Sequence, residues 1–527
     1  MLLLAYICLM AFAPLVYTTT RTISLTKLRD KTFVKTLLKD YLRTFPVVAI
    51  VFLPVLILPA IMPAYVVVLH LVFAPLLVLE LGHVHLFRTR IGLNTFYSLF
   101  VSNMRETKEF ISQNISKGQF LLAALIHFAP LYFLAKIPPP AFESEDMRWT
   151  SVGIAALLAL PFVLNLFKSA DSRKDGYVMN PFTNVIYHHF LFRRNYRKLQ
   201  SLIAEHAAPP FRGLASKLPS GTKQTYVIVI GESANAQHFG CYGYGRATTE
   251  FTDRLGAEMI RVAGVRSPFA QTIPSLEKVL TFADNDHADL VYAKGSIIDW
   301  FNDAGFRTYW FSNQYALDDT ALTAMTSHAS ASKCFNFSGM KRFEKAGLDG
   351  DMLPEVRRLL ANGDERKVVF LHLIGSHSAY VNRYPDEFHH FEGQAPGRNL
   401  PPEKLQFLNA YDDSIRYTDW FVSEVVKELQ SLSGVSYMLY FADHGEDIYD
   451  STDARIMGHG PLANEPMTSV PFQLWISEDL NRLRPDLRAA ETKSDYNLMD
   501  AIHTMIDVSS LTGPDYEPEK SVFSRRS

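Results

Sequence analysis

The sequence predicts an N-terminal bundle of membrane-spanning helices over residues 1–168 and a C-terminal α/β domain over residues 223–527, joined by a bridging segment over 169–222. Three observations support this division. Long apolar runs are concentrated in the first part, short apolar strands alternate with helical patterns in the last part, and the segment between them is basic and aromatic. A chain of 527 residues also exceeds the usual size of one domain.

Five apolar stretches in the first part are each close to the roughly 20 residues that a helix needs to cross a bilayer. They are Leu2–Thr18, Phe45–Met62, Tyr65–Leu81, Phe120–Ala135 and Ser151–Phe167. The last two are also short enough to be buried helices of a soluble domain, but five such runs together favour a membrane protein. The first stretch lacks a basic start and a small-residue cleavage site, so we expect a span and not a cleaved signal peptide.

Polar residues occur within or beside these stretches. His70, Glu80 and His83 would be costly if they faced lipid. We therefore expect them either at a site near the membrane surface or in hydrogen bonds between helices.

The bridging segment over 169–222 is basic, aromatic and interrupted by prolines. Its densest part runs from Phe190 to Lys198, where four basic residues lie near three aromatic ones. This composition is typical of an amphipathic helix that lies on a membrane surface. An exposed linker helix would show the same pattern.

Beyond Gln224, short apolar strands alternate with helical patterns. The strands are YVIVI at Tyr226, RTYWF at Arg307, VVFLHL at Val368, YMLYF at Tyr437 and VPFQLW at Val470. Strands that are apolar on both faces and separated by helices predict a mostly parallel sheet covered by helices. Ligands bind such sheets beyond the carboxyl ends of the strands.

Charge and cysteine content narrow the function classes. The formal net charge is -2 and the sequence pI is about 6.8, so no large basic face is implied and nucleic acid is not an expected partner. Cys8, Cys241 and Cys334 allow at most one disulfide, and the sequence leaves open whether Cys241 and Cys334 pair.

Potential metal ligands follow two of the predicted strands. Glu232 comes directly after the first strand, and Asp443 and His444 come directly after the strand at Tyr437. Three protein ligands with an open fourth position are the usual arrangement of a catalytic zinc site. The histidine favours zinc over calcium or magnesium.

A candidate nucleophile precedes a predicted helix. In QTIPSL, Pro274 suits the first helical turn and Thr272 lies just ahead of it. The unpaired N–H groups and the positive dipole end at this position favour an alkoxide and a phosphate, and a bound metal would lower the pKa of the hydroxyl. Thr272 could also be an ordinary N-cap, and Ser267, five residues earlier, is a second candidate.

Other histidines have less specific signals. His377 in Gly-Ser-His and His459 in Gly-His-Gly-Pro could bind a phosphoryl oxygen, protonate a leaving group or hold a second metal, or could simply be loop residues. His372 lies inside a predicted strand and is expected to be a core histidine. The role of His238 is left open.

Together these residues resemble the phosphoethanolamine transferases of the alkaline phosphatase and sulfatase superfamily. The motifs that carry the resemblance are IGESANAQHFGCYGYGRATTE, SPFAQTIPSLEKVLTFAD, LHLIGSHSAYVNRYP, YFADHGEDIYD and GHGPLANEPMTSVPFQLW. The TIPSLEKVLTF pattern and the scarcity of cysteine are most similar to the branch that modifies the heptose of the lipopolysaccharide core. The resemblance implies a sulfatase-like C-terminal domain.

The resemblance also implies roles for individual residues. Glu232, Thr272, Asp443 and His444 would be ligands of one zinc ion, with Thr272 also accepting the transferred group. His377 and His459 would bind the phosphoryl group or a second zinc. Asn103 and Glu106 match a region that in the family contacts the head group of the donor lipid. Asn235 stands where many relatives carry arginine.

The function that this implies is transfer of phosphoethanolamine from phosphatidylethanolamine to an envelope acceptor through a phosphoethanolamine-threonine intermediate. Lipopolysaccharide core heptose, lipid A phosphate and periplasmic glucan are all possible acceptors. A hydrolase or glycerophosphate transferase on the same scaffold is the alternative enzyme, and a lipid sensor without activity is the alternative from another class.

The expected location is the bacterial inner membrane, with the catalytic domain in the periplasm. Basic residues crowd the segment from Arg21 to Arg43, and their charge by itself would place that segment in the cytoplasm. With five spans, the C-terminal domain would then be cytoplasmic as well. The resemblance requires the opposite orientation, which we adopt.

Overall fold

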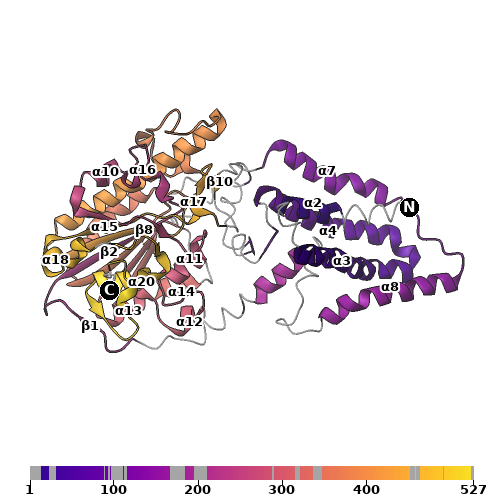
Figure 1. The fold of residues 1–527 in the computed structure, drawn as a ribbon, viewed down its shortest axis with the longest axis horizontal. Helices are drawn as coiled ribbons and strands as arrows, with labels where there is room; N and C mark the ends of the chain where they lie inside the picture. The colour runs from indigo at the N-terminus through magenta and orange to yellow at the C-terminus, as the bar shows by residue number, and fades with distance from the viewer. Residues whose placement is uncertain are drawn as a thin grey trace. The chain divides into compact units, whose positions relative to one another are not determined.

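The computed structural model divides into two compact units, a helical unit over Met1–Tyr196 and an α/β unit over Arg197–Ser527 (Figure 1). The structure describes residues 13–22, 31–87, 90–92, 95–96, 111, 115–166, 184–194, 197, 211–287, 290–314, 321–335, 347–451, 457–458, 463–490 and 492–523. The predicted bridging segment contains the boundary between the two units and is described only in part.

Helices make up most of the described part of the helical unit. They are α2 (Ala13–Thr22), α3 (Lys31–Ile57), α4 (Met62–Phe87), α7 (Lys117–Leu134) and α8 (Glu145–Leu166). The start of α7 is fixed by a capping box, in which the Ser116 hydroxyl and the Gln119 side chain each accept a backbone N–H of the other residue. Residues 184–194 form a further helix.

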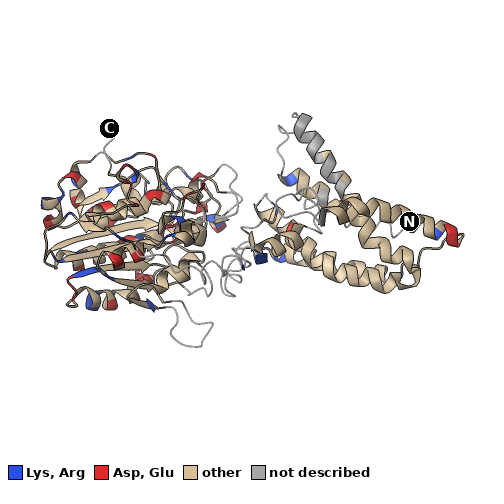
Figure 2. Ribbon diagram, turned by 90° about the horizontal axis from the view of Figure 1, so that it is seen from below, with Lys and Arg blue, Asp and Glu red and all other residues tan. Residues whose placement is uncertain are grey.

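Three segments of these helices are long and apolar enough to cross a membrane: Pro59–Leu86, Lys117–Leu134 and Glu145–Leu164. Figure 2 shows how few charged residues lie along them, in contrast to the α/β unit. The apolar part of α3, Thr44–Ile57, is shorter. The first predicted span lies mostly outside the described residues, so five spans remain a prediction.

The second predicted span differs in its end point from the structure. We expected it to run to Met62, but α3 ends at Ile57 and a short 3-10 helix, Pro59–Ile61, leads into α4. The prolines at this junction explain the break, because proline lacks the N–H group that would continue the helix. The start of the helix differs as well. α3 begins at Lys31, within the basic segment from Arg21 to Arg43, and not at the predicted start of the span at Phe45.

The polar residues of the helical unit contact other segments of this unit. His70 Nε2 lies 2.8 Å from the backbone oxygen of His127 on α7. The Glu80 carboxylate is fully buried and accepts a hydrogen bond of 2.9 Å from the Asn184 side chain. These contacts agree with the expectation of hydrogen bonds between helices.

The core of the α/β unit is a seven-stranded sheet in the order β3-β11-β8-β2-β7-β5-β6. Its strands are β2 (Gln224–Gly231), β3 (Met259–Arg261), β5 (Arg307–Ser312), β6 (Ala331–Cys334), β7 (Arg366–His372), β8 (Val435–Ala442) and β11 (Phe472–Ile476). The strands from β8 to β6 in this order are parallel. β11 runs antiparallel to both of its neighbours, β8 and β3, so β3 has the same direction as the parallel strands. The predicted mostly parallel α/β sheet is confirmed.

Helices cover both faces of the sheet. Figure 1 shows α10, α15 and α16 on one face and α11, α13, α14 and α20 on the other. The helices of the unit are α10 (Glu250–Asp253), α11 (Thr272–Val279), α12 (Leu290–Ala293), α13 (Ile297–Asp303), α14 (Ala321–Ser327), α15 (Leu353–Leu360), α16 (Pro402–Gln430), α17 (Glu465–Thr468), α18 (Glu478–Leu483), α19 (Asp486–Ala489) and α20 (Ala501–Val508). Because both faces are covered, every residue of β2 and β8 is buried.

Three pairs of two-residue strands complete the unit. They are β1 (Ala215–Ser216) with β13 (Leu511–Thr512), β4 (Val265–Arg266) with β12 (Tyr496–Asn497), and β9 (Asp447–Ile448) with β10 (Met457–Gly458). Cys241 and Cys334 do not form a disulfide with each other, and Cys8 lies outside the described residues.

Candidate metal centre and active site

The sheet register places the three predicted metal ligands together. Strands β2 and β8 are parallel neighbours, and Gly231 pairs with Ala442 at their carboxyl ends. The residues that directly follow the two strands, Glu232 after β2 and Asp443 after β8, therefore lie at the same edge of the sheet. His444 follows Asp443 directly.

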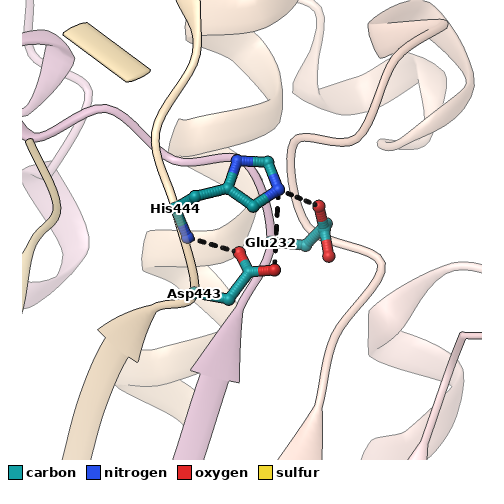
Figure 3. Close-up of side chains that lie close together, drawn as sticks. All are labelled: Glu232, Asp443 and His444. Carbon is teal, nitrogen blue, oxygen red and sulfur yellow. Dashed lines mark hydrogen bonds and ion pairs between the residues drawn. The ribbon is translucent and has the colours of Figure 1, made fainter. Parts of the chain in front are cut away.

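The ligand atoms of Glu232, Asp443 and His444 all lie within 4.8 Å of one another (Figure 3). His444 Nε2 lies 3.2 Å from Glu232 Oε1 and 3.6 Å from Asp443 Oδ2. The imidazole is oriented by its other nitrogen, because Nδ1–H donates to the backbone oxygen of Gly445 at 2.8 Å. Nε2 is therefore the nitrogen that faces the two carboxylates, as expected for a metal ligand.

Charge on these side chains is costly because they are buried: all three are at most 1% exposed. Burial and the charge of Glu232 raise the pKa of Asp443 well above its usual range. Burial acts in the same direction on Glu232, but the hydrogen bond and the charge of His444 hold the pKa of Glu232 well below its usual range. Despite burial, the two carboxylates raise the pKa of His444 to about 10.

Thr272 completes the site from the start of α11. Its Oγ1 donates to Glu232 Oε2 at 3.1 Å, and the polar hydroxyl beside the Asp443 carboxyl counteracts part of the rise that burial and Glu232 cause in the pKa of Asp443. Gln271 occupies the N-cap position and makes no side-chain capping bond. Thr272 is the first residue of the helix, and its hydroxyl faces the carboxylates.

Ser267, the second candidate nucleophile, is directed elsewhere. Its buried hydroxyl lies 2.7 Å from the backbone oxygen of Phe269 and 2.6 Å from Ser275 Oγ, and it also bonds to the backbone oxygen of Asp443. The structure therefore brings Thr272, and not Ser267, to the carboxylate groups.

The chemistry of this donor set fits zinc. Two carboxylates, one imidazole nitrogen and one hydroxyl offer four oxygen and nitrogen ligands on one side of the sheet edge, the composition expected for a site in which one ligand also reacts. The described residues contain one group of at least three histidine, cysteine or acidic side chains that could hold a metal ion, and this is that group.

A tight turn after β7 packs against Glu232. Gly375 has a φ of 47°, and a Cβ at this position would lie 2.9 Å from the backbone N and O of Glu232. The N–H of Ser376 donates to the same backbone oxygen at 3.0 Å. Only glycine fits so close an approach in this left-handed conformation.

Buried charges hold this turn on both sides. The carboxylate of Asp349 accepts the N–H groups of Ile374 and Gly375, each at 3.0 Å, and burial raises the pKa of Asp349. Arg383 Nε donates to the backbone oxygen of His377 at 2.9 Å. The turn therefore places His377 at the same sheet edge, where its charge contributes to the low pKa of Glu232.

Three further predicted site residues, His459, Asn103 and Glu106, lie outside the described residues. The expectation for His372 agrees with the structure: it is 3% exposed within β7, and burial lowers its pKa to about 4. His238 contacts two carboxylates, with Nδ1 2.8 Å from Asp412 and Nε2 3.1 Å from Asp450.

Gln314 and Asp349 were not among the residues predicted from the sequence. Gln314 Nε2 donates to Glu232 Oε2 at 2.6 Å. A usable signal existed for Gln314, because it lies three residues beyond the predicted strand at Arg307, at the sheet edge where ligands are expected. Asp349 follows the undescribed residues 336–346, and its sequence context contains no comparable signal.

The profile of the sulfatase family matches residues 224–511. The chain belongs to the sulfatase family. Phosphoethanolamine transferase EptC of Escherichia coli (strain K12) is 27% identical to this chain over 453 residues, which are 82% of this chain and 77% of EptC.

Two solved structures extend the comparison. The C-terminal periplasmic domain of EcEptC from Escherichia coli, in complex with Zn, is 28% identical, with a TM-score of 0.56 over 60% of this chain and 90% of that one. The integral membrane protein lipooligosaccharide phosphoethanolamine transferase A (EptA) from Neisseria meningitidis has a TM-score of 0.68 over 97% of this chain and 95% of that one. At 18% identity, EptA shows a shared fold that includes the N-terminal helical region.

These findings confirm the predicted resemblance to phosphoethanolamine transferases and the predicted sulfatase-like C-terminal domain.

Proposed function

We propose that this sulfatase-family protein transfers phosphoethanolamine from phosphatidylethanolamine to an envelope acceptor, with Thr272 as the covalent carrier of the group. The protein is an enzyme of the phosphoethanolamine transferase type. The observation that carries the finer proposal is the position of the Thr272 hydroxyl, 3.1 Å from Glu232 and beside Asp443 and His444.

In this proposal Glu232, Thr272, Asp443 and His444 hold a zinc ion, and His377 and His459 bind the phosphoryl group or a second zinc. A bound zinc would lower the pKa of a ligated hydroxyl and stabilise negative charge on a phosphoryl oxygen. The Zn complex of the EcEptC domain supports zinc as the metal.

The first step forms a bond between Thr272 Oγ1 and the phosphorus of the lipid and breaks the bond from phosphorus to the diacylglycerol oxygen. Glu232 Oε2, which already accepts the hydroxyl hydrogen, is positioned to take the proton. His377 or His459 supplies a proton to the leaving diacylglycerol oxygen. In the second step an acceptor hydroxyl or phosphate oxygen attacks the same phosphorus, and Thr272 Oγ1 leaves and regains the proton held by Glu232. A hydroxyl acceptor gives its own proton to the histidine that protonated the diacylglycerol oxygen.

We further propose five membrane spans, an inner-membrane location and a periplasmic catalytic domain, connected by an amphipathic bridging segment over 169–222. Asn103 and Glu106 would contact the donor head group. The scarcity of cysteine and the lack of a disulfide between Cys241 and Cys334 favour an acceptor in the lipopolysaccharide core, with lipid A or a periplasmic glucan as alternatives.

Diacylglycerol release from defined lipids tests this proposal. The full-length protein is reconstituted with zinc in vesicles that contain phosphatidylethanolamine, or phosphatidylcholine only. We expect release from the first and not the second, and loss of release in Thr272→Val, which keeps the side-chain shape without the hydroxyl. Thr222→Val, in the turn before β2 at the opposite end of that strand, is the matched control.

Two results would contradict the proposal: diacylglycerol release that persists in Thr272→Val, or phosphate or sulfate release from small esters without any lipid reaction. The second result would instead indicate a hydrolase.

A further inference from the structure

Glu232 is held by two neutral hydrogen-bond donors in addition to the two site groups that it contacts. Gln314 Nε2 donates to Oε2 at 2.6 Å, and Ser233 Oγ donates to Oε1 at 2.8 Å. The other neighbour of each oxygen belongs to the site: Thr272 Oγ1 at 3.1 Å from Oε2, and His444 Nε2 at 3.2 Å from Oε1. Each carboxylate oxygen therefore faces one neutral donor and one site group.

The side chain of Gln314 is itself fixed in orientation. Its Nε2 donates a second hydrogen bond to the backbone oxygen of Leu373 at 2.9 Å, so both amide hydrogens are engaged. Its backbone N–H donates to Ser312 Oγ at 3.1 Å, and Cys334 Sγ donates to its backbone oxygen at 3.0 Å. Gln314 thus joins the ends of β5 and β7 to the ligand that follows β2.

We propose that Gln314 is a positioning residue for the metal site. It fixes the Glu232 carboxylate so that the side facing Thr272, Asp443 and His444 stays available to a cation. This inference rests on the proposed metal site. Groups that hydrogen bond to metal ligands set the ligand orientation, and their loss weakens metal binding.

The amide suits this task better than a basic side chain would. A lysine or arginine at this position would place a full positive charge beside Glu232 and would repel a cation at the site. The neutral N–H of Gln314 orients the carboxylate without cancelling its charge. Ser233 Oγ acts in the same way on the other oxygen, so we expect the two donors to share the task.

The test measures the affinity of the protein for zinc alone, without lipid. Gln314→Met keeps the length of the side chain and removes both N–H donors. We expect the zinc dissociation constant of the full-length protein in detergent, measured by competition with a chromogenic chelator, to rise by about 10- to 100-fold. Ser233→Ala should also weaken zinc binding, and the double variant should bind more weakly than either single one.

Gln224→Met is the matched control. Gln224 is also a buried glutamine, 3% exposed, but it lies at the first position of β2, the opposite end of the strand from Glu232. We expect its zinc affinity to stay within twofold of the wild type. Tryptophan fluorescence during denaturation verifies that each variant is folded, and Gln314→Asn, whose shorter amide cannot span the same two acceptors, replaces Gln314→Met if that variant does not fold.

Unchanged zinc affinity in a folded Gln314 variant would overturn the inference, as would an equal loss in Gln224→Met. A wild type that binds no zinc would instead contradict the proposed metal site, so the two failures are distinguishable. Kinetics add a second readout: a positioning role predicts a lower kcat at limiting zinc that excess zinc restores, with KM for the lipid unchanged. A raised KM at unchanged zinc affinity would assign Gln314 to the lipid and overturn the inference.

Discussion

Replacement of Gly375 by alanine tests the close approach between the turn after β7 and the strand end that carries Glu232. A Cβ at Gly375 would lie 2.9 Å from the backbone N and O of Glu232 and 3.2 Å from its Cβ. Ordinary contacts between carbon atoms are about 3.5–4.0 Å. Because the opposing atoms belong to the backbone, either the turn or the end of β2 must move.

The expected cost has two parts. The left-handed φ of 47° costs an alanine about 1–2 kcal/mol, and overpacking of a close contact costs about 1–3 kcal/mol. The variant should therefore lose about 2–5 kcal/mol of unfolding free energy. Because metal ligands tolerate displacements of about 0.2 Å, a shift of Glu232 should also weaken zinc binding. A displacement near 1 Å can reduce a rate by about 100-fold.

Gly393→Ala separates the cost of the left-handed backbone from the cost of the close contact. Gly393 has a φ of 70°, but no atom lies within 4 Å of a Cβ built there, so its replacement has the backbone cost without the clash. Denaturation of both variants is followed by fluorescence, since four of the five tryptophans lie in the α/β unit. If Gly375→Ala were no less stable than Gly393→Ala, and bound zinc and released diacylglycerol like the wild type, the reasoning about this contact would be wrong.

Three further predictions concern stability. Zinc at about 100 times its dissociation constant should stabilise the wild type by about 2.7 kcal/mol, and Asp443→Asn should lose most of this gain. Equal denaturation midpoints of the wild type with zinc and with chelator would contradict this prediction. Burial and the charge of Lys520 lower the pKa of His503 to about 4. The free energy of unfolding present above pH 6.5 should therefore fall by about 3 kcal/mol as the pH drops to 4, and denaturation of His503→Asn should show a shallower fall. Asp349→Asn leaves a backbone N–H of the His377 turn poorly paired and should cost about 1–3 kcal/mol and reduce transfer, while the zinc content measured by plasma emission stays unchanged.

The α/β fold could be predicted because its parallel strands are buried on both faces. β2, β5, β7 and β8 each contain a run of apolar residues, and their bounds agree with the predicted strands to within a few residues. β6 was missed because three of its four residues are exposed and its sequence, ASKC, has no apolar run. β3 was also missed, because it is only three residues long.

The candidate metal site could be predicted for a topological reason. Glu232 and Asp443 directly follow two strong strand patterns, and parallel neighbours bring their carboxyl ends to the same edge. That β2 and β8 are neighbours could not be read from the chain, because about 200 residues separate them and the order of strands depends on tertiary packing.

The groups that hold the ligands were harder to predict: Gln314 had only its position just beyond a predicted strand as a signal, and Asp349 had none. Gln314 and Asp349 act through hydrogen bonds to residues far away in sequence, and their own residue types are common in loops. Their roles depend on distances of about 3 Å that emerge only in the folded chain. Predicted site residues outside the described part of the chain, among them Asn103 and His459, stay predictions.

The proposed mechanism depends on the Thr272 hydroxyl accepting the phosphoethanolamine group. Full-length protein loaded with zinc is mixed with phosphatidylethanolamine vesicles without an acceptor, quenched in acid, digested and analysed by tandem mass spectrometry. We expect an added phosphoethanolamine on Thr272 that disappears when acceptor is supplied. The same modification on another residue, or diacylglycerol release with Thr272 unmodified throughout the reaction, would contradict it.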